Sequence, residues 1–263
     1  MIHKFYAPPE FIERRIQVEM LGAGGTGGEV LDAFARLHIA LCALGHPGGV
    51  RLRLWDGDTV SAANIGRQRF GPSDIGRSKS IMLIQRYNMF FGFDWEAIPH
   101  HWTAEHADAD TSADLIVSCV DRAAVRVEVA RYAKHFDHTL WADFGNGAST
   151  GQFILGHISK GESATLRLPN VFDLHPELVT LDDSQEPSCS LAQALRSQDL
   201  FVNRMLADAG MAIVWNLLRG SIEAHGCLID VRNGYVTPLH IDPTVWQSYG
   251  YLNPPHASVS PSQ

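Results

Sequence analysis

The chain has 263 residues, of which 45% are hydrophobic and 19% charged, and its formal net charge is −8. This composition is typical of a globular protein with a sizeable core and excludes intrinsic disorder. The negative charge argues against a broad basic face for nucleic acid, so any phosphate site must be local. We find no apolar stretch long enough to span a membrane, and the four scattered cysteines predict a reduced, cytoplasmic protein.

Predicted strands alternate with predicted helices in the first half of the chain. The run at 114–120 is almost continuously apolar, as in a strand buried on both faces. Alternation of this kind predicts an α/β fold with a Rossmann-like, doubly wound and mainly parallel sheet. We expect strands at 15–21, 50–55, 114–120 and 139–144, and helices after the glycine cluster that begins at residue 22, at 79–91 and at 122–136.

The pattern changes after Gly151, where helix-strand alternation gives way to irregular sequence and a final hairpin. The hairpin predicts an antiparallel C-terminal extension of the sheet. We expect a single domain over 1–252. It would contain a strand at 152–158, an irregular crossover loop at about 159–189, a helical stretch at 191–224, a hairpin at 227–242 with Asn233-Gly234 as its turn, and after it a flexible tail at 253–263.

The first chemical motif is a glycine loop, Gly22-Ala-Gly24-Gly25-Thr-Gly27, between a predicted strand and a predicted helix. Gly22 allows a tight turn, Gly24 lets a phosphate approach the backbone, and Gly27 lets helix and strand pack closely. The start of the helix offers N–H donors and a partial positive charge to an anion. Asp56 closes the second strand and can accept hydrogen bonds from ribose hydroxyls. These features indicate a nucleotide, and they fit NAD and ATP equally.

A second polar cluster runs from Asp56 to Lys79. Arg67 and Lys79 suit a triphosphate because two cations offset the charge on a leaving pyrophosphate. Arg67 can hold two oxygens at once, whereas Lys79 is a point charge near a predicted helix start. Asn64 and Gln68 can hold the orientation of the ligand. A dehydrogenase would need a flat apolar slot for nicotinamide here, so the cluster favours ATP over NAD.

The glycine loop, this cluster and Asp121 follow the order and approximate spacing of the ThiF/MoeB/ubiquitin-activating-enzyme superfamily. The chain resembles that superfamily over about residues 15–242, and most of all the ThiF-like proteins of bacterial PRTRC gene cassettes. The resemblance implies that Asp121, at the carboxyl end of a buried strand, holds Mg²⁺ on the phosphates. Arg122 follows it, where the family often has Asn. The resemblance also implies ATP contacts at Gly24, Asp56, Asn64, Arg67 and Lys79.

Cys189 lies in the string Pro187-Ser-Cys189-Ser190, which resembles the crossover-loop cysteine of ubiquitin-activating enzymes. A thiol near a helix start has a lowered pKa and attacks an acyl-adenylate more readily, giving a thioester. The alternative is a loop cysteine without chemistry. Relatives also carry an upstream arginine that reaches the ATP of a partner subunit, for which Arg14 and Arg15 are the candidates.

These features predict an enzyme that uses ATP and Mg²⁺ to adenylate the C-terminal carboxylate of a small ubiquitin-like (β-grasp) protein. No catalytic base is needed because the carboxylate is ionised at pH 7. From the resemblance we expect a homodimer and a conjugating-enzyme-like partner. Three alternatives stay open: adenylation without a thioester, serving sulfur transfer or modification of a small molecule or tRNA; an NAD-dependent oxidoreductase; and a non-catalytic nucleotide-binding subunit.

Overall fold

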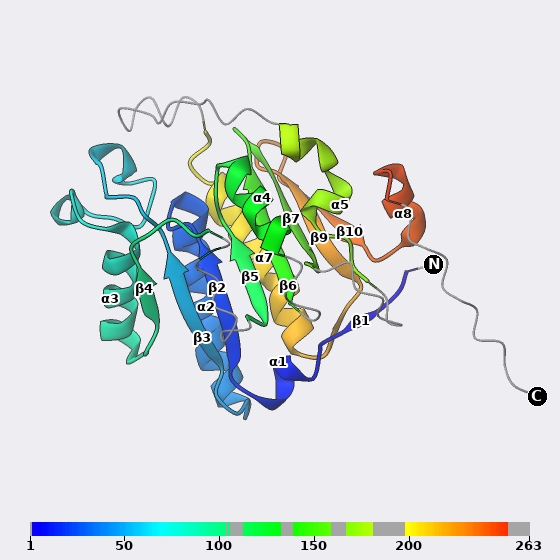
Figure 1. Cartoon of the computed structure of the whole chain (residues 1–263), viewed down its shortest axis with the longest axis horizontal. Helices are drawn as coiled ribbons and strands as arrows, with labels where there is room; N and C mark the ends of the chain where they lie inside the picture. The colour runs from blue at the N-terminus through cyan, green and yellow to red at the C-terminus, as the bar shows by residue number, and fades with distance from the viewer. Residues whose placement is uncertain are drawn as a thin grey trace, which may run out of the picture.

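An eight-stranded sheet forms the centre of the protein (Figure 1). The structure, a computed structural model, describes residues 2–103, 105, 113–132, 139–158, 167–180 and 198–251. In chain order the strands of this sheet are β2 (Ile16–Leu21), β3 (Val50–Trp55), β4 (Glu96–Ile98), β5 (Leu115–Ser118), β6 (Leu140–Asn146), β7 (Thr150–His157), β9 (Ala224–Asp230) and β10 (Tyr235–His240).

The strands lie side by side in the order β10-β9-β7-β6-β5-β2-β3-β4. The five from β4 to β6 pair in parallel, whereas β7, β9 and β10 extend the sheet by antiparallel pairing. The predicted mainly parallel sheet with an antiparallel C-terminal extension is therefore confirmed. Because β2 lies between β3 and β5, the chain builds outward from β2 in both directions. Such a switch point leaves a crevice at the carboxyl ends of the strands, where open α/β sheets bind ligands.

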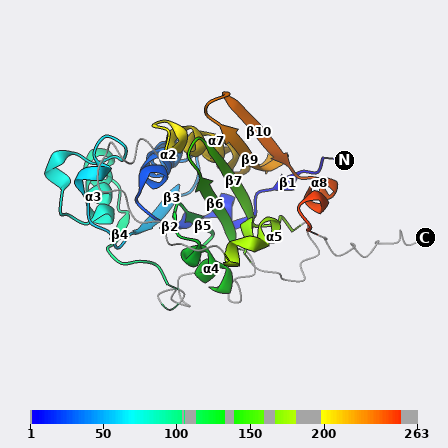
Figure 2. The same ribbon diagram turned by 90° about the horizontal axis from the view of Figure 1, so that it is seen from above.

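Helices cover both faces of the sheet, as the view from above shows (Figure 2). α2 (Gly25–Ala43), α3 (Lys79–Phe91) and α7 (Val202–Leu218) lie on one face, and α2 packs against α7. α4 (Ala123–Tyr132) and α5 (Val171–Leu174) lie on the other. None of the helices in the described ranges is long and apolar enough to cross a membrane. Smaller elements are β1 (Phe5–Tyr6), α1 (Glu10–Glu13), β8 (Ser221–Ile222) and α8 (Pro243–Ser248).

The pattern of apolar residues along each strand explains which of its faces are buried. Every residue of β5 is buried, as the continuous apolar run predicts. β3 alternates instead: Leu52 and Leu54 are fully buried, and Arg51 is exposed. Arg53, on the same face as Arg51, is half-buried because its guanidinium donates to Glu19 of β2 at 2.6 Å. A charged side chain is thus kept on a partly covered face by an acid on the neighbouring strand.

The structure corrects two predictions in the second half of the chain. The predicted loop at 159–189 contains α5 and a 3₁₀ segment at Pro176–Thr180. The helical stretch predicted at 191–224 is helical only from Val202 to Leu218 among the described residues, and β8 follows and pairs with β1. The reason is Gly220, whose φ of 134° lies outside the helical range. Residues 159–166, 181–197 and 252–263 lie outside the described residues, so the predictions for them stay predictions.

Candidate functional site

The glycine loop, Asp56 and Asp121 lie at one edge of the parallel sheet, the upper edge in Figure 1. β2 runs into the glycine loop, β3 is followed directly by Asp56, and β5 ends three residues before Asp121. Carboxyl ends of parallel strands share an edge, so residues far apart in sequence become neighbours there. This is where the sequence predicted the nucleotide.

The glycines of the loop differ in what surrounds them. Gly22 has a φ of 96°, and a Cβ on it would lie 2.6 Å from the carbonyl oxygen of Cys119. A Cβ on Gly27 would lie 2.1 Å from the carbonyl oxygen of Gly22. Gly24, the N-cap of α2, has no atom within 4 Å of an added Cβ. Gly22 and Gly27 therefore serve close packing, whereas Gly24 leaves open space at the helix start.

Two asparagines brace the loop from other parts of the chain. Oγ1 of Thr26 lies 3.0 Å from Oδ1 of Asn203 and 3.2 Å from Oδ1 of Asn146. A Cβ on Gly25 would lie 2.2 Å from Nδ2 of Asn203, so only glycine fits beside that amide. Asn203 comes from the first turn of α7 and is buried. The sequence carried no signal for this contact, because its partners lie 177 residues apart.

Asp56 ties the glycine loop to the end of β3. Its Oδ2 accepts from the backbone N–H of Ala23 at 2.6 Å, and its Oδ1 accepts from the N–H of Asp58 at 2.8 Å. Burial raises the pKa of Asp56, while the hydrogen bond from Ala23 and the positive charge of Lys79 act in the opposite direction. Asp56 is therefore a structural support of the loop as well as the predicted ribose acceptor.

Lys79 is the first residue of α3, as the sequence predicted for a cation near a helix start. Its Nζ lies 2.9 Å from Oδ2 of Asp58, and the lysine is buried although Asp58 is exposed. No pattern in the sequence predicted the ion pair between Lys79 and Asp58. The pair holds the ammonium group at the carboxyl edge.

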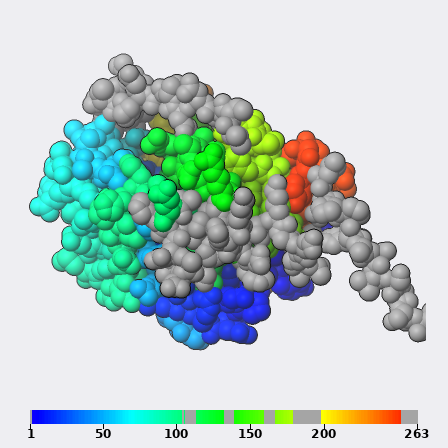
Figure 3. Space-filling model, in the orientation of Figure 1, coloured from blue at the N-terminus to red at the C-terminus, as the bar shows by residue number. Residues whose placement is uncertain are grey.

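The segment between β3 and α3 carries Asn64, Arg67 and Gln68, and it forms the upper left of the molecule in the space-filling view (Figure 3). Oδ1 of Asn64 accepts from the N–H of Ser61 at 2.8 Å and so caps the 3₁₀ turn Ala62–Asn64. Arg69 anchors the segment to α2, with Nη2 2.7 Å from Glu29. These contacts fix the backbone that presents Arg67.

Arg67 and Gln68 keep polar atoms without partners. Nη1 of Arg67 donates to Oε1 of Gln198 at 2.6 Å, but its buried Nε has no hydrogen-bond partner within the described part of the chain, and neither has the buried Oε1 of Gln68. Burial lowers the pKa of the Arg67 guanidinium, and the negative charge of Asp121 opposes this. Buried donors without partners are rare, and a bound phosphate would supply an acceptor for this one.

Asp121 is exposed and follows β5 at the carboxyl edge. In the described ranges no three His, Cys, Asp or Glu side chains gather into a group that could enclose a metal ion. Mg²⁺ commonly binds through one or two carboxylates together with phosphate oxygens and water. A single exposed carboxylate that acts electrostatically on Arg67 therefore fits Mg²⁺ on a nucleotide and not a closed protein cage.

The cysteines divide into two groups. Cys119 and Cys227 are buried, and burial raises the pKa of both thiols, that of Cys227 to about 11. Both are thus poor nucleophiles near neutral pH. Cys42 is exposed on α2. Cys189, the predicted nucleophile, lies outside the described residues.

The two upstream arginines lie at the opposite, amino edge of the sheet. Arg14 contacts Asp114 through both terminal nitrogens, at 2.8 and 2.5 Å, and Arg15 is paired with Asp94 in the same bidentate way. Neither arginine reaches the nucleotide edge of its own chain.

A sequence model of the ThiF family matches residues 13–237 of this chain. The chain belongs to the ThiF family. The match includes the glycine loop, the cluster from Asp56 to Lys79 and Asp121, and it confirms the superfamily that these residues predicted. The finer resemblance to ThiF-like proteins of PRTRC cassettes stays a prediction.

Two plant enzymes are similar in sequence to this ThiF-family chain. It is 27% identical over 169 residues to ubiquitin-like modifier-activating enzyme 5 of Oryza sativa subsp. japonica, and 25% identical over 172 residues to the Arabidopsis thaliana enzyme of that name. Each match covers 57% of this chain and 37% of the plant enzyme. The chain thus matches well under half the length of these relatives.

Two solved structures share the ThiF-family fold. E. coli MccB superposes with a TM-score of 0.58 at 15% identity, over 87% of this chain and 63% of MccB. PaaA superposes with a TM-score of 0.57 at 15% identity, over 86% of this chain and 64% of PaaA. MccB has also been solved with ATP, and with AMPCPP and MccA.

Proposed function

We propose that this protein uses ATP to adenylate a carboxylate, and that the carboxylate is the C-terminus of a small ubiquitin-like (β-grasp) protein. One observation carries the proposal. A single edge of the sheet brings together an open glycine loop, the cations Arg67 and Lys79, and the exposed carboxylate of Asp121. A triphosphate needs these groups, whereas hydride transfer to nicotinamide needs none of the cations.

The chain's own residues supply positioning and charge. The start of α2 at Gly24 and Gly25 would hold phosphate oxygens, with Asn64 and Gln68 beside them. Arg67 and Lys79 would offset the charge on the pyrophosphate. Asp121 would hold Mg²⁺, which when bound neutralises phosphate charge.

The reaction needs no proton transfer. An ionised carboxylate of the substrate attacks the α-phosphorus of ATP, forming an acyl-phosphate bond as the bond to the β-phosphate oxygen breaks. Acyl-AMP and pyrophosphate are the products. Because the attacking carboxylate is already ionised at pH 7, the absence of a base from the proposed set is no obstacle.

The relatives support a protein substrate. The two plant enzymes activate ubiquitin-like modifiers by name, and MccB was solved with AMPCPP and MccA. We infer that a flexible C-terminal tail enters the carboxyl edge of this protein and that the body of the small protein stays outside.

We further propose that Cys189 accepts the acyl group. Its sulfur would attack the acyl carbon, forming a thioester as AMP leaves, and a conjugating-enzyme-like partner would then take the acyl group by thiol exchange. The support is the Pro187-Ser-Cys189-Ser190 string and the poor nucleophilicity of Cys119 and Cys227.

Pyrophosphate exchange tests the first step. The full chain is incubated with ATP, Mg²⁺, labelled pyrophosphate and a candidate ubiquitin-like protein from a neighbouring gene. We expect label in ATP with the free C-terminal carboxylate and none with the same protein amidated at its C-terminus. Exchange that is equal with the amidated protein, or absent with every candidate, would contradict the proposal.

A thioester assay tests the second step. We expect an adduct between the enzyme and the small protein that DTT cleaves and that Cys189→Ala lacks, while Cys42→Ala keeps it. Pyrophosphate exchange by Cys189→Ala should be unchanged. An adduct that survives in Cys189→Ala would remove this cysteine from the mechanism.

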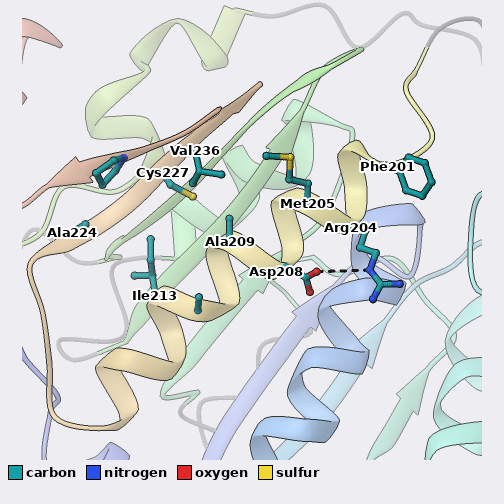
Figure 4. A pocket seen from close by; sticks show the side chains of 11 residues that line it. Phe201, Arg204, Met205, Asp208, Ala209, Ile213, Ala224, Cys227 and Val236 are labelled. Carbon is teal, nitrogen blue, oxygen red and sulfur yellow. Dashed lines mark ion pairs between the residues drawn. The ribbon is translucent and has the colours of Figure 1, made fainter. Parts of the chain in front are cut away.

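A groove on the antiparallel half supports the proposed homodimer. It has a volume of about 670 Å³ and lies between α7 and the β9-β10 hairpin, where Met205, Ile213 and Val236 point toward it (Figure 4). Phe201 and Val236 at this face are largely exposed. We propose that a second copy of the chain covers the groove. We also propose, from the sequence, that the protein works in the cytoplasm. Sedimentation should show a dimer that Val236→Glu dissociates, and a monomeric wild type would contradict this.

A further inference from the structure

A buried carboxylate on β6 joins three elements beside the candidate site. Oδ1 of Asp143 accepts from Oγ of Ser118 at 2.5 Å and from Nε of Arg126 at 2.7 Å. Nη2 of Arg126 also donates to the carbonyl of Phe144 at 3.1 Å, and Nε1 of Trp141 donates to Oγ of Ser118 at 2.7 Å. We call Ser118, Asp143 and Arg126 the Asp143 clamp. All three are buried, and Asp143 is only 1% exposed.

Asp121 lies between two members of the clamp, Ser118 and Arg126, along the chain. Ser118 is the last residue of β5 and pairs with Asp143 in the parallel register of β5 and β6. Arg126 lies on α4, the helix that begins just after Asp121. One carboxylate therefore holds both ends of the segment that carries Asp121. A shift at either end would move Asp121 relative to the sheet.

The same segment supports the glycine loop. A Cβ on Gly22 would come within 2.6 Å of the carbonyl oxygen of Cys119, so the turn of the loop rests directly on the residue after Ser118. The clamp thus holds the segment on which the phosphate loop packs, and the same segment carries Asp121.

Connecting these elements through a buried carboxylate has a desolvation cost. Oδ2 of Asp143 is buried, and no described residue hydrogen-bonds to it. Glu19, the comparable buried acid on β2, uses both oxygens, one for Arg53 and one for the indole of Trp55. Replacing a buried ion pair by apolar groups of similar volume is often neutral or stabilising, so stability alone does not account for an acid at this position.

We propose that Asp143 is a positioning residue for the metal and nucleotide, acting through Ser118 and Arg126 on the segment that carries Asp121. This inference rests on the proposed role of Asp121 in holding Mg²⁺. Partners that orient a metal ligand commonly change metal affinity about 10- to 100-fold when they are replaced. Since Asp143 acts through Asp121, removing both should cost no more than removing Asp121 alone.

The test measures metal binding and not turnover. Mn²⁺ is titrated into the full chain with AMPCPP and the bound ion is counted by electron paramagnetic resonance, for wild type, Asp143→Asn, Asp121→Asn and the double variant. We expect each single variant to weaken Mn²⁺ affinity about tenfold and the double variant to match Asp121→Asn. Glu19→Gln is the matched control: it should lower thermal stability and leave Mn²⁺ affinity at the wild-type value.

The outcomes separate the two proposals. If Asp121→Asn weakens Mn²⁺ binding but Asp143→Asn does not, or if the two effects multiply in the double variant, the clamp has only a structural role and the inference is wrong. If Asp121→Asn itself leaves Mn²⁺ affinity unchanged, the proposed metal role fails and the inference fails with it. Should Asp143→Asn not fold, Arg126→Lys replaces it in the same cycle, because lysine keeps the charge but lacks the planar fork through which Arg126 donates from Nε to Asp143 and from Nη2 to Phe144.

Discussion

The arginines at the two edges of the parallel sheet differ in the partners that hold them. At the amino edge, Arg14 and Arg15 are each bound to an aspartate through two nitrogens. At the carboxyl edge, Arg67 has one hydrogen bond and a buried Nε without a partner among the described residues, and Asp121 is exposed. The buried Nε of Arg15 also lacks a partner among the described residues. The difference therefore lies in charge pairing: each amino-edge arginine is paired with a carboxylate, whereas the hydrogen bond of Arg67 goes to an uncharged amide oxygen.

This difference indicates where a ligand belongs. A buried guanidinium that has no carboxylate partner keeps its charge available for an anionic ligand. Polyanionic ATP with a cation would satisfy the carboxyl edge. The predictions below test this contrast, from the largest expected effect to the smallest.

Replacing one arginine at each edge by alanine should affect different properties, catalysis at the carboxyl edge and stability at the amino edge. Arg67→Ala should lower pyrophosphate exchange about 100- to 1,000-fold, since it removes a preorganised charge, and leave thermal stability unchanged. Arg14→Ala should leave exchange near wild type and lower the free energy of unfolding by about 1 to 2 kcal/mol, because it removes a bidentate partner of buried Asp114. Equal losses of exchange in both variants would abolish the contrast between the edges.

His225, a buried histidine on β9, has both ring nitrogens hydrogen-bonded within the protein. Nδ1–H of His225 donates to the carbonyl of Leu155 at 2.8 Å, and Nε2 accepts from the indole N–H of Trp246 at 2.9 Å. Protonation of Nε2 would place its N–H donor against the indole N–H donor of Trp246. Burial accordingly lowers the pKa of His225 from 6.5 to about 4.

Because the unfolded chain binds the proton at higher pH than the folded chain, stability should fall as pH drops from 6.5 to 4. The histidine contribution is about 3 kcal/mol over that window, and it is fully present above pH 6.5. Urea denaturation at several pH values should show a smaller acid loss in His225→Gln than in wild type, which separates this contribution from carboxylate titration. The same acid loss in both proteins would contradict the assignment.

Two glycines of the phosphate loop separate folding from ligand binding. Gly27→Ala should lower the free energy of unfolding by about 1 to 3 kcal/mol, because its Cβ would meet the backbone of Gly22. Gly24→Ala should leave stability unchanged, since nothing lies near its Cβ, and weaken ATP binding by about tenfold. Thermal unfolding and ATP titration measure the two effects. ATP binding that is unchanged in Gly24→Ala would argue against phosphate at this position.

The smallest expected effect concerns Gln198, which occupies Nη1 of Arg67 at 2.6 Å. If phosphate takes its place, Gln198→Ala should strengthen ATP binding by about threefold to tenfold, the worth of one hydrogen bond. Gln17→Ala, which removes a glutamine bonded to the backbone of Arg15 at the amino edge, is the matched control and should change nothing. Weaker ATP binding in Gln198→Ala would mean that Gln198 orients Arg67 instead of competing for it.

Strong local patterns predicted most of the fold. The glycine loop, the apolar run of β5 and the Asn233-Gly234 turn each marked an element that the structure contains. β4 was missed because its three residues, Glu96 to Ile98, pair only with β3 and carry no alternation long enough to detect. The sequence predicts α7 to continue past Leu218 because apolar residues lie on both sides of Gly220, and these hide the stop that this glycine makes.

The sequence by itself determined the parallel sheet, the nucleotide loop, the family and the candidate cations, because these depend on periodicity and short motifs within one stretch of chain. Only the tertiary structure decided which side chains restrain them: Asn203 beside Gly25, Gln198 on Arg67, and Asp143 holding both ends of the segment around Asp121. Those contacts join elements that meet only when parallel strands end at a common edge, and no pattern along the chain records which residues that edge brings together.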